Sequence, residues 1–231
     1  MPKQTFFNLA DKKRQRITEL AIAEFANADY DNASISNIVK RAKIAKGSFY
    51  QYFEDKRDLY LYLIDLASQQ RMAFIQEARE ARKPKRKKRN FFQELRWLFG
   101  ISTQFSMQHP HLNQIINRAA YSDSPVKEEA LRHIQIAAKQ PIQDLVKKGI
   151  ANGDLRPELD PDLATFVILT ASNNLRYFIP EKLNLDTHKL AESADIDIDM
   201  QAVERIFDEL IQVFERGLGS DGAARPTENR T

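Results

Sequence analysis

The chain has 231 residues, of which 42% are hydrophobic, with seven glycines and no cysteine. The lack of cysteine excludes disulfides, thiolate zinc sites and cysteine nucleophiles, and the scarcity of glycine disfavours hairpins and phosphate-binding loops. No stretch approaches the roughly eighteen uncharged residues of a membrane-spanning helix, and no basic start leads into a long apolar run. We therefore expect a soluble cytoplasmic protein, built mainly from helices, that has no membrane partner.

The net charge of +3 is divided unevenly along the chain. Residues 1–90 hold 20 Lys or Arg against 11 Asp or Glu, a net charge of +9, whereas residues 91–231 hold 15 against 21, a net charge of −6. A polyanion would bind to the basic part. The plain alternative is that charge is often uneven in helical proteins.

Apolar residues at helical spacing, from Ile17 to Phe25, predict a first helix at residues 10–28. Four cations crowd its start: Lys12, Lys13, Arg14 and Arg16. Residues 29–33 interrupt the pattern, and Ser34 can then cap a second helix of barely two turns.

A third short helix is expected at residues 47–53, and Asp55 opens a fourth with Asp58 three positions on, an acidic form of the capping box. The apolar stripe of the fourth helix extends to about Arg82. Two helices as short as the second and third need longer neighbours as a platform. A helix-turn-helix on a three-helix core meets that need, and in this motif the second helix of the pair enters the major groove of DNA.

Side chains suited to DNA gather in and around the third helix. Lys46 can reach guanine acceptors, Gln51 can pair with adenine, and small neighbours let the backbone approach base edges. Tyr50 and Tyr52 can donate hydroxyls to phosphates, and Lys56 lies at a helix start, which favours an anion. The candidate DNA-binding residues are Ser34, Ser36, Asn37, Lys46, Gly47, Ser48, Tyr50, Gln51, Tyr52 and Lys56.

The remaining rings of this segment, Phe49 and Phe53, are expected to anchor it in the core. The plain alternative for the whole set is that Tyr50 and Tyr52 merely pack and that Lys46 is merely solvated.

The stretch SISNIVKRAKIAKGSFYQYFEDKRDLYLYLID, residues 34–65, resembles the DNA-binding domain of the tetracycline-repressor (TetR/AcrR) family of bacterial transcription regulators. The pattern that carries the resemblance is Ile38-Val39, a short turn, Lys46-Gly47-Ser48-Phe49-Tyr50, Tyr52-Phe53, and Lys56 followed by Leu59. Two positions depart from it, since the family usually has Ser or Thr at Ala45 and often has His at Tyr52. Such departures bear on operator preference and leave the fold intact.

The run RKPKRKKR, from Arg82 to Arg89, has seven charges in eight positions, and Pro84 predicts that the fourth helix ends near it. It is either an additional phosphate clamp or a solvated connection between domains. The second interpretation is favoured, because the family's linker normally lies above the DNA.

The second half of the chain predicts a further series of helices. Residues 91–107 form a strongly aromatic helix around Trp97, and a short piece follows at residues 112–120. Residues 125–152 form the next helix, which Pro141 should kink or divide.

Gly153 is expected to end that helix as a C-terminal cap, after which Asp160 caps the following helix and Pro161 takes its first position. The polar residues 181–198 are expected to form a mobile loop, and residues 219–231 a disordered tail.

Residues 163–178 and 203–214 are apolar on nearly every side, which indicates helices that are buried on two fronts. The resemblance implies that these two helices pair with their twins across a two-fold axis. The expected product is a homodimer that matches a palindrome with half-sites roughly 34 to 36 Å apart or somewhat more. Burial against the rest of the same chain is the alternative.

The resemblance also implies an effector site among the fifth to eighth helices, where binding reorients the fourth helix and so releases DNA. Each residue proposed to line this effector site could instead be an ordinary residue of the hydrophobic core. An aromatic and aliphatic wall favours a mostly apolar effector, lipid-like or aromatic. The candidate residues are Trp97, Ile101, Phe105, Ile116, Phe166 and Asn173.

Catalysis is not expected, because the sequence has no glycine-rich phosphate loop, no nucleophile elbow and no paired acid and base on one face. His109 and His111 lack a carboxylate at ligand spacing, so neither a metal nor a cofactor is expected.

The sequence thus predicts an all-α protein with a helix-turn-helix DNA-binding domain at residues 1–60 and a connecting helix at about 55–82. A helical effector-binding and dimerisation domain follows at 83–218, and the tail at 219–231. The expected function is a bacterial repressor that binds a palindromic double-stranded operator as a homodimer and lies on the nucleoid when bound. The alternatives are a helical protein-protein adaptor without an effector and an enzyme with an unrecognised site.

Overall fold

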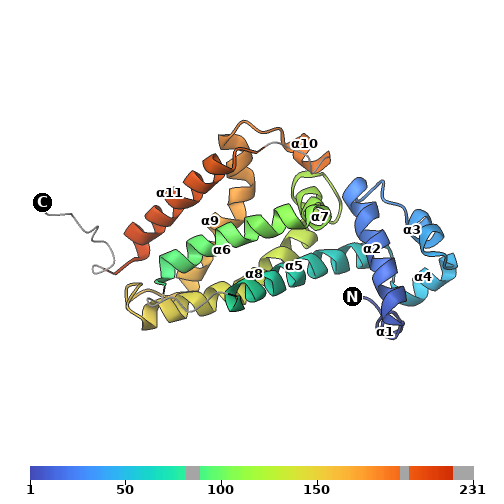
Figure 1. Ribbon diagram of the computed structural model, residues 1–231, viewed down its shortest axis with the longest axis horizontal. Coiled ribbons are helices and arrows are strands. Elements are labelled where there is room, and N and C mark those ends of the chain that lie inside the picture. The colour runs from blue at the N-terminus through green and yellow to red at the C-terminus, as the bar shows by residue number, and fades with distance from the viewer. Residues whose placement is uncertain (82–88, 193–197, 221–231) are drawn as a thin grey trace, which may run out of the picture. The chain divides into compact units, whose positions relative to one another are not determined.

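The computed structural model describes residues 1–81, 89–192 and 198–220, and its regular elements over these ranges are helices (Figure 1). In chain order they are α1 (Gln4–Phe7), α2 (Asp11–Asn27), α3 (Ile35–Ala42), α4 (Lys46–Tyr52), α5 (Lys56–Glu80), α6 (Phe91–Gln108), α7 (Pro110–Tyr121), α8 (Lys127–Ala151), α9 (Pro161–Lys182), α10 (Thr187–Glu192) and α11 (Met200–Leu218). The predicted all-α fold is confirmed. Most of the basic run, residues 82–88, and the tail from residue 221 lie outside the described residues.

Local signals explain where several helices begin and end. The Ser34 side chain accepts a hydrogen bond from the Asn37 N–H at 3.3 Å, as the predicted cap of α3 requires. Asp160 caps α9 in the same way, accepting from the Leu163 N–H at 2.7 Å. Gly153, with φ of +76°, follows α8, where a left-handed residue suits a helix end.

Three expectations about the elements are wrong or incomplete. Pro141 lies inside α8 and does not divide it. The expected loop at residues 181–198 contains α10, because Asp186 accepts from the N–H of His188 at 2.9 Å and the buried Leu190 anchors the helix. The short helix α1 was not predicted at all.

The chain divides into two compact units, each with its own packing. Unit 1 comprises Met1–Met72, Ser106–Ile134 and Leu185–Asp197, and unit 2 comprises Ala73–Phe105, Gln135–Asn184 and Ile198–Thr231. These limits differ from the sequence domains, whose boundaries stay a prediction. No helix within the described ranges is long and apolar enough to cross a membrane.

In unit 1, α2 packs against both α3 and α7, and α7 packs against α10. The Arg118 guanidinium of α7 donates to the Ala26 carbonyl at the end of α2, at 3.2 Å. Figure 1 shows α3 and α4 next to each other beside α2, with α1 at the end of α4. The longer helices thus form the platform that the two short ones need.

In unit 2, a core cluster joins α6, α8, α9 and α11 with the loop between α8 and α9. Its buried members are Phe91, Phe92, Leu95, Val146, Leu155, Ala164, Ile168, Ile211 and Phe214. The loop also pairs with the end of α11, through a bridge of Leu155 with Gly219 and a bond from the Arg156 N–H to the Leu218 carbonyl at 3.1 Å.

Candidate nucleic-acid interface

The helix pair α3 and α4 is joined by three residues, 43–45. Lys43 takes a left-handed conformation, with φ of 55°, and ends α3. The chain then reverses, and the Ile44 N–H donates to the Val39 carbonyl at 3.1 Å. Because α2 packs on α3 and α3 packs on α4, this is a helix-turn-helix held by a third helix, as the sequence predicts.

One side of α4 and the residue that follows it carry aromatic rings that are buried in the core. Phe49 is 1% exposed and Phe53 0%, and their ring centroids lie 5.4 Å apart. Both are therefore core anchors, as predicted. They fix which side of α4 faces outward.

The outward side of α4 is polar. Lys46, Gly47 and Gln51 are exposed, and Tyr50 keeps 48% of its surface accessible. These positions lie on one helical face by their spacing. A side chain at Gly47 would meet no atom within 4 Å, so the space beside the backbone is open there. The face matches what a major-groove reader requires, namely donors around a backbone that can approach the base edges closely.

Tyr52 does not belong to that face. Its side chain is 5% exposed, and its ring centroid lies 6.2 Å from that of Phe6. The sequence alone predicts a place beside DNA for Tyr52, because nothing in it signals α1, whose Phe6 helps to cover this ring. The structure makes Tyr52 part of the core beneath α4.

Lys56, at the start of α5, is already engaged within the chain. Its ammonium donates to the carbonyls of Asp31 at 3.0 Å and Ala33 at 3.3 Å, and it lies 4.8 Å from the ring centroid of Tyr30. The lysine thus ties the loop between α2 and α3 to α5. If the Lys56 ammonium bound a DNA phosphate, it would do so while also holding this loop.

The start of α3 presents the remaining candidates. Ser36 and Asn37 are exposed, and Ser34 is half-buried as the cap. Glu24 of α2 accepts from the Ser34 N–H at 2.9 Å and from the Asn37 side-chain amide at 3.2 Å. One carboxylate therefore fixes the end of α3 that would face the DNA backbone.

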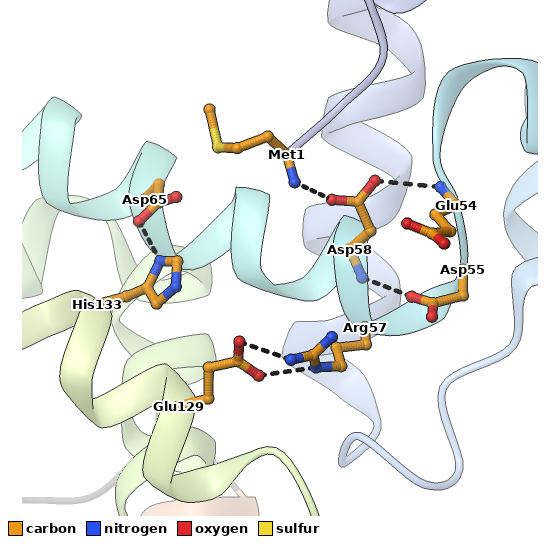
Figure 2. Close-up of polar contacts among 8 residues, drawn as sticks. All are labelled: Met1, Glu54, Asp55, Arg57, Asp58, Asp65, Glu129 and His133. Carbon is orange, nitrogen blue, oxygen red and sulfur yellow. Dashed lines mark hydrogen bonds and ion pairs between the residues drawn. The ribbon is translucent and has the colours of Figure 1, made fainter.

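The opening of α5, drawn in Figure 2, is held by carboxylates. Asp55 accepts from the Asp58 N–H at 2.8 Å, which is the first half of the predicted capping box. In the other half, Asp58 accepts from the Glu54 N–H at 3.1 Å rather than from the Asp55 N–H. The buried Asp58 carboxylate also pairs with the amino group of Met1.

Two further side-chain contacts in Figure 2, an ion pair and a hydrogen bond, join α5 to α8 within unit 1. Arg57 donates to both oxygens of Glu129 at 2.7 Å, and this hydrogen bonding raises the pKa of the guanidinium. Further along both helices, His133 Nδ1 of α8 lies 2.8 Å from a carboxylate oxygen of Asp65 on α5. These contacts fix the first half of α5, which follows α4 after three residues.

The candidate effector residues are less coherent than the candidate DNA-binding ones. Ile101 and Phe105 are buried in unit 2, whereas Ile116 belongs to unit 1. Trp97 is half-buried, and the guanidiniums of Arg79 and Arg89 each lie 5.6 Å from its ring centroid. The candidate wall is therefore not brought together within one unit.

Two candidates on α9 also differ from the expectation. Phe166 is 64% exposed, so it does not line an interior wall of the chain. Asn173 is half-buried, and its carbonyl accepts from the Arg176 guanidinium at 2.7 Å.

Helix α9 has a second, apolar face that remains open. Ile168 is fully buried in the core of unit 2, but large hydrophobic side chains elsewhere on the helix are 39% to 64% exposed: Leu163, Phe166, Val167, Tyr177 and Phe178. On α11, Val213 is 64% exposed. The expected burial of α9 on two fronts is met on one front by the chain itself.

Comparison with known proteins agrees with this arrangement. The family described as bacterial regulatory proteins, tetR family, matches residues 17–63. The family described as tetracyclin repressor-like, C-terminal domain, matches residues 89–219, more than half of the chain.

Similar proteins include a TetR family transcriptional regulator of Chloroflexus aurantiacus J-10-FL. Its crystal structure is 39% identical, with a TM-score of 0.61, over 95% of this chain and 99% of that one. The fatty acid metabolism regulator protein of Bacillus subtilis is 26% identical over 167 residues, which are 68% of this chain and 77% of that protein. The structure of FadR from Bacillus subtilis in complex with stearoyl-CoA is similar in fold, with 20% identity, a TM-score of 0.57, and coverage of 85% of this chain and 96% of that one.

Both halves of the chain thus match one family, and the helix-turn-helix seen in unit 1 lies inside the first match. Regulators of this family are non-enzymatic proteins that bind DNA and small-molecule effectors and act as dimers. This chain belongs to the TetR family of bacterial transcriptional regulators.

Proposed function

We propose that the chain is a repressor that reads a palindromic operator with α4 of each subunit and releases it when a mostly apolar effector binds. The observation that carries this proposal is the outward face of α4, where Lys46, Gly47, Tyr50 and Gln51 stand exposed over buried aromatic anchors. In this proposal residues 1–60 form the DNA-binding domain, and residues 83–218 bind the effector and the second subunit. A repressor of this kind acts in the cytoplasm, on the nucleoid when it is bound to DNA.

Each exposed group has a proposed part in DNA binding. Gln51 pairs with an adenine edge and Lys46 with guanine acceptors. Tyr50, Ser36 and Asn37 donate to phosphates and so set the register of α4 in the groove. Base contacts give the preference for one sequence, whereas phosphate contacts give affinity that falls with salt.

The open apolar face of α9 supports a homodimer as the binding form. Exposure of apolar side chains such as Leu163 and Phe166 to water is unfavourable, and the free energy falls when a second subunit covers them. A two-fold dimer presents two copies of α4, so the operator would be a palindrome with half-sites about 34 to 36 Å apart or somewhat more.

The proposed effector is a molecule with a long apolar part. The regulators of similar sequence and fold include one described as a fatty acid metabolism regulator and one solved with stearoyl-CoA. Aromatic and aliphatic residues dominate the described core of unit 2, with Ile101 and Phe105 among them. An effector that prefers one arrangement of α5 would shift the dimer away from the form that fits DNA.

Selection of bound duplexes from a random pool tests the proposal. The full-length protein should enrich a palindrome, and long-chain fatty acids and their coenzyme A esters should then be screened for release of that duplex. Gln51→Ala should lose preference at one base pair of each half-site, by about 1 to 3 kcal/mol. Gln135→Ala, at an exposed glutamine of α8, is the matched control and should enrich the wild-type sequence.

An unchanged base preference in Gln51→Ala would contradict the assignment of α4 as the reader. Enrichment of no duplex at all would favour the alternative of a protein-protein adaptor.

A further inference from the structure

The short helix α1 contacts the C-terminal end of α4 (Figure 1). Its four residues, Gln4–Phe7, carry no periodic signal that would predict a helix. The proposed reading of DNA uses α3 and α4 and gives this segment no part.

Helix α4 has only seven residues, so its end presents a problem of hydrogen bonding. The last four carbonyls of any helix have no partner within the helix, and in α4 these four are more than half of its residues. The Phe53 N–H satisfies one of them, the Phe49 carbonyl, at 2.9 Å. The carbonyls of the three following residues need donors from elsewhere.

The N-terminal segment supplies all three donors. The Lys3 N–H donates to the Tyr52 carbonyl at 2.8 Å, and the Lys3 ammonium donates to the Tyr50 carbonyl at 2.9 Å. The Thr5 hydroxyl donates to the carbonyl of Gln51. A cation at this end also interacts favourably with the negative end of the helix dipole. Three consecutive carbonyls of α4, including those of the proposed base reader and its neighbour, are thus held by residues outside the helix-turn-helix.

The same segment is fixed in the core by Phe6. This side chain is 0% exposed, and its ring centroid lies 4.7 Å from that of Phe53 and 5.5 Å from that of Tyr62 on α5. On the other side, the Arg14 guanidinium of α2 donates to the Phe7 carbonyl at 2.8 Å. The donors of Lys3 and Thr5 therefore come from a support attached to both α2 and α5.

We infer that Lys3, Thr5 and Phe6 are positioning residues for DNA recognition, which fix the C-terminal end of α4 so that Tyr50 and Gln51 meet the DNA in one orientation. The inference rests on the proposed function, since it assigns the segment to a helix that reads DNA. A helix of seven residues has little stability of its own. Without its external donors the last turn of α4 would fray, and the bases would meet Gln51 in several orientations.

Substitution of Thr5 tests the inference with little disturbance of the core, because this side chain is exposed. Thr5→Val keeps the shape and removes the hydroxyl, whereas Thr5→Ser keeps the hydroxyl and is the conservative control. The dissociation constants of the full-length variants should be measured for the selected operator and for a scrambled duplex of equal length, at one salt concentration. Thermal unfolding and amide hydrogen exchange of residues 49–53 complete the comparison.

Thr5→Val should weaken operator binding about three- to tenfold, as the loss of one hydrogen bond implies, and should speed amide exchange at the end of α4. Binding to the scrambled duplex should change less than about twofold, because it depends on phosphate charge. Thr5→Ser should restore wild-type values. A loss of folded protein alone would instead lower both affinities together.

Full operator affinity in Thr5→Val, or an equal loss on both duplexes, would overturn the inference while leaving the proposed function in place. A wild-type protein that prefers no duplex would remove the proposed function itself, and the inference with it.

Discussion

The outward faces of α4 and α9 differ in chemistry, polar on α4 and apolar on α9, although each helix is half-buried in the same way. Both helices bury one side in the core of their own unit, α4 through Phe49 and Tyr52 and α9 through Ile168. On the free side, α4 shows Lys46 and Gln51, whereas α9 shows apolar side chains such as Phe166. The same pattern of a half-buried helix thus yields two surfaces with different chemistry.

The difference predicts how each surface behaves when its partner is absent. A polar face is well hydrated and exchanges water for DNA when DNA is present, with an affinity that depends on salt. An exposed phenylalanine remains unfavourable in water, since full burial of such a side chain is worth about 1.5 to 3 kcal/mol. We therefore expect the face of α4 to be open much of the time and the face of α9 to be covered in the working protein.

Phe166→Asp should give the largest effect, because it places a charge in the proposed dimer contact. An unpaired charge buried there costs about 3 to 5 kcal/mol, so the dissociation constant of the dimer should rise about 100-fold or more. Sedimentation velocity over a dilution series measures this change. Ile136→Asp is the matched control, since Ile136 is 71% exposed on α8.

Equal dissociation of both variants would mean that α9 has no special part in the dimer. An undisturbed dimer in Phe166→Asp would place the subunit contact elsewhere.

Lys46→Ala should alter the polar face without touching the apolar one. A lysine that reaches guanine acceptors also brings one positive charge among the phosphates, so the loss of Lys46 should weaken operator binding and reduce the slope of log affinity against log salt by up to about one unit. Titrations at four or more salt concentrations, with the dimer checked by sedimentation, test this. Lys147→Ala, an exposed lysine of α8, provides the control; if it changes the slope as much as Lys46→Ala does, the salt dependence is not specific to α4.

The sequence was a good guide wherever a single residue decides the local structure. Ser34 and Asp160 cap helices as expected, because each offers a side-chain acceptor next to a free N–H of the first turn. The anchors Phe49 and Phe53 follow in the same way from helical spacing and from ring size.

The sequence is a poor guide where residues that contact each other lie far apart along the chain. Tyr52 is buried because Phe6, 46 positions earlier, covers its ring, and a segment as short as α1 has no periodicity to announce it. Similarly, α10 depends on its packing against α7, which no pattern within residues 181–198 reveals. The candidate effector wall was the least predictable set, because a buried aromatic residue in the core and one in a pocket have the same sequence signature.

Ser34→Ala sharpens the comparison at a smaller scale, since it weakens the support of the polar face and leaves the apolar face unchanged. Loss of the cap of α3 should lower the free energy of unfolding by about 1 kcal/mol. Chemical denaturation measures this loss. Ser36→Ala, in the exposed first turn of the same helix, should leave stability within about 0.5 kcal/mol of the wild type, and an equal cost in both variants would argue against the cap as the cause.

The smallest expected effect concerns the cores beneath the two faces at high pH. The core of unit 1 contains Tyr60, 3% exposed, and burial raises the pKa of its phenol. Among the described residues, the members of the core cluster around Ile168 are aliphatic side chains and phenylalanines. Because the pKa is raised on folding, the folded chain keeps a proton that the unfolded chain releases. The contribution of the buried, protonated Tyr60 to the free energy of unfolding is therefore fully present below the ordinary tyrosine pKa of about 10 and is lost as the pH rises above it.

Amide exchange in unit 1 should accordingly speed up before that in unit 2 as the pH is raised from about 9 to about 11, after correction for the intrinsic exchange rate. Tyr60→Phe should reduce the difference between the units, and Tyr50→Phe, at an exposed ring, should not. If both units loosen together in the wild type, or if Tyr60→Phe behaves as the wild type does, the buried phenol does not set the alkaline limit. The two faces would then differ in their surfaces alone.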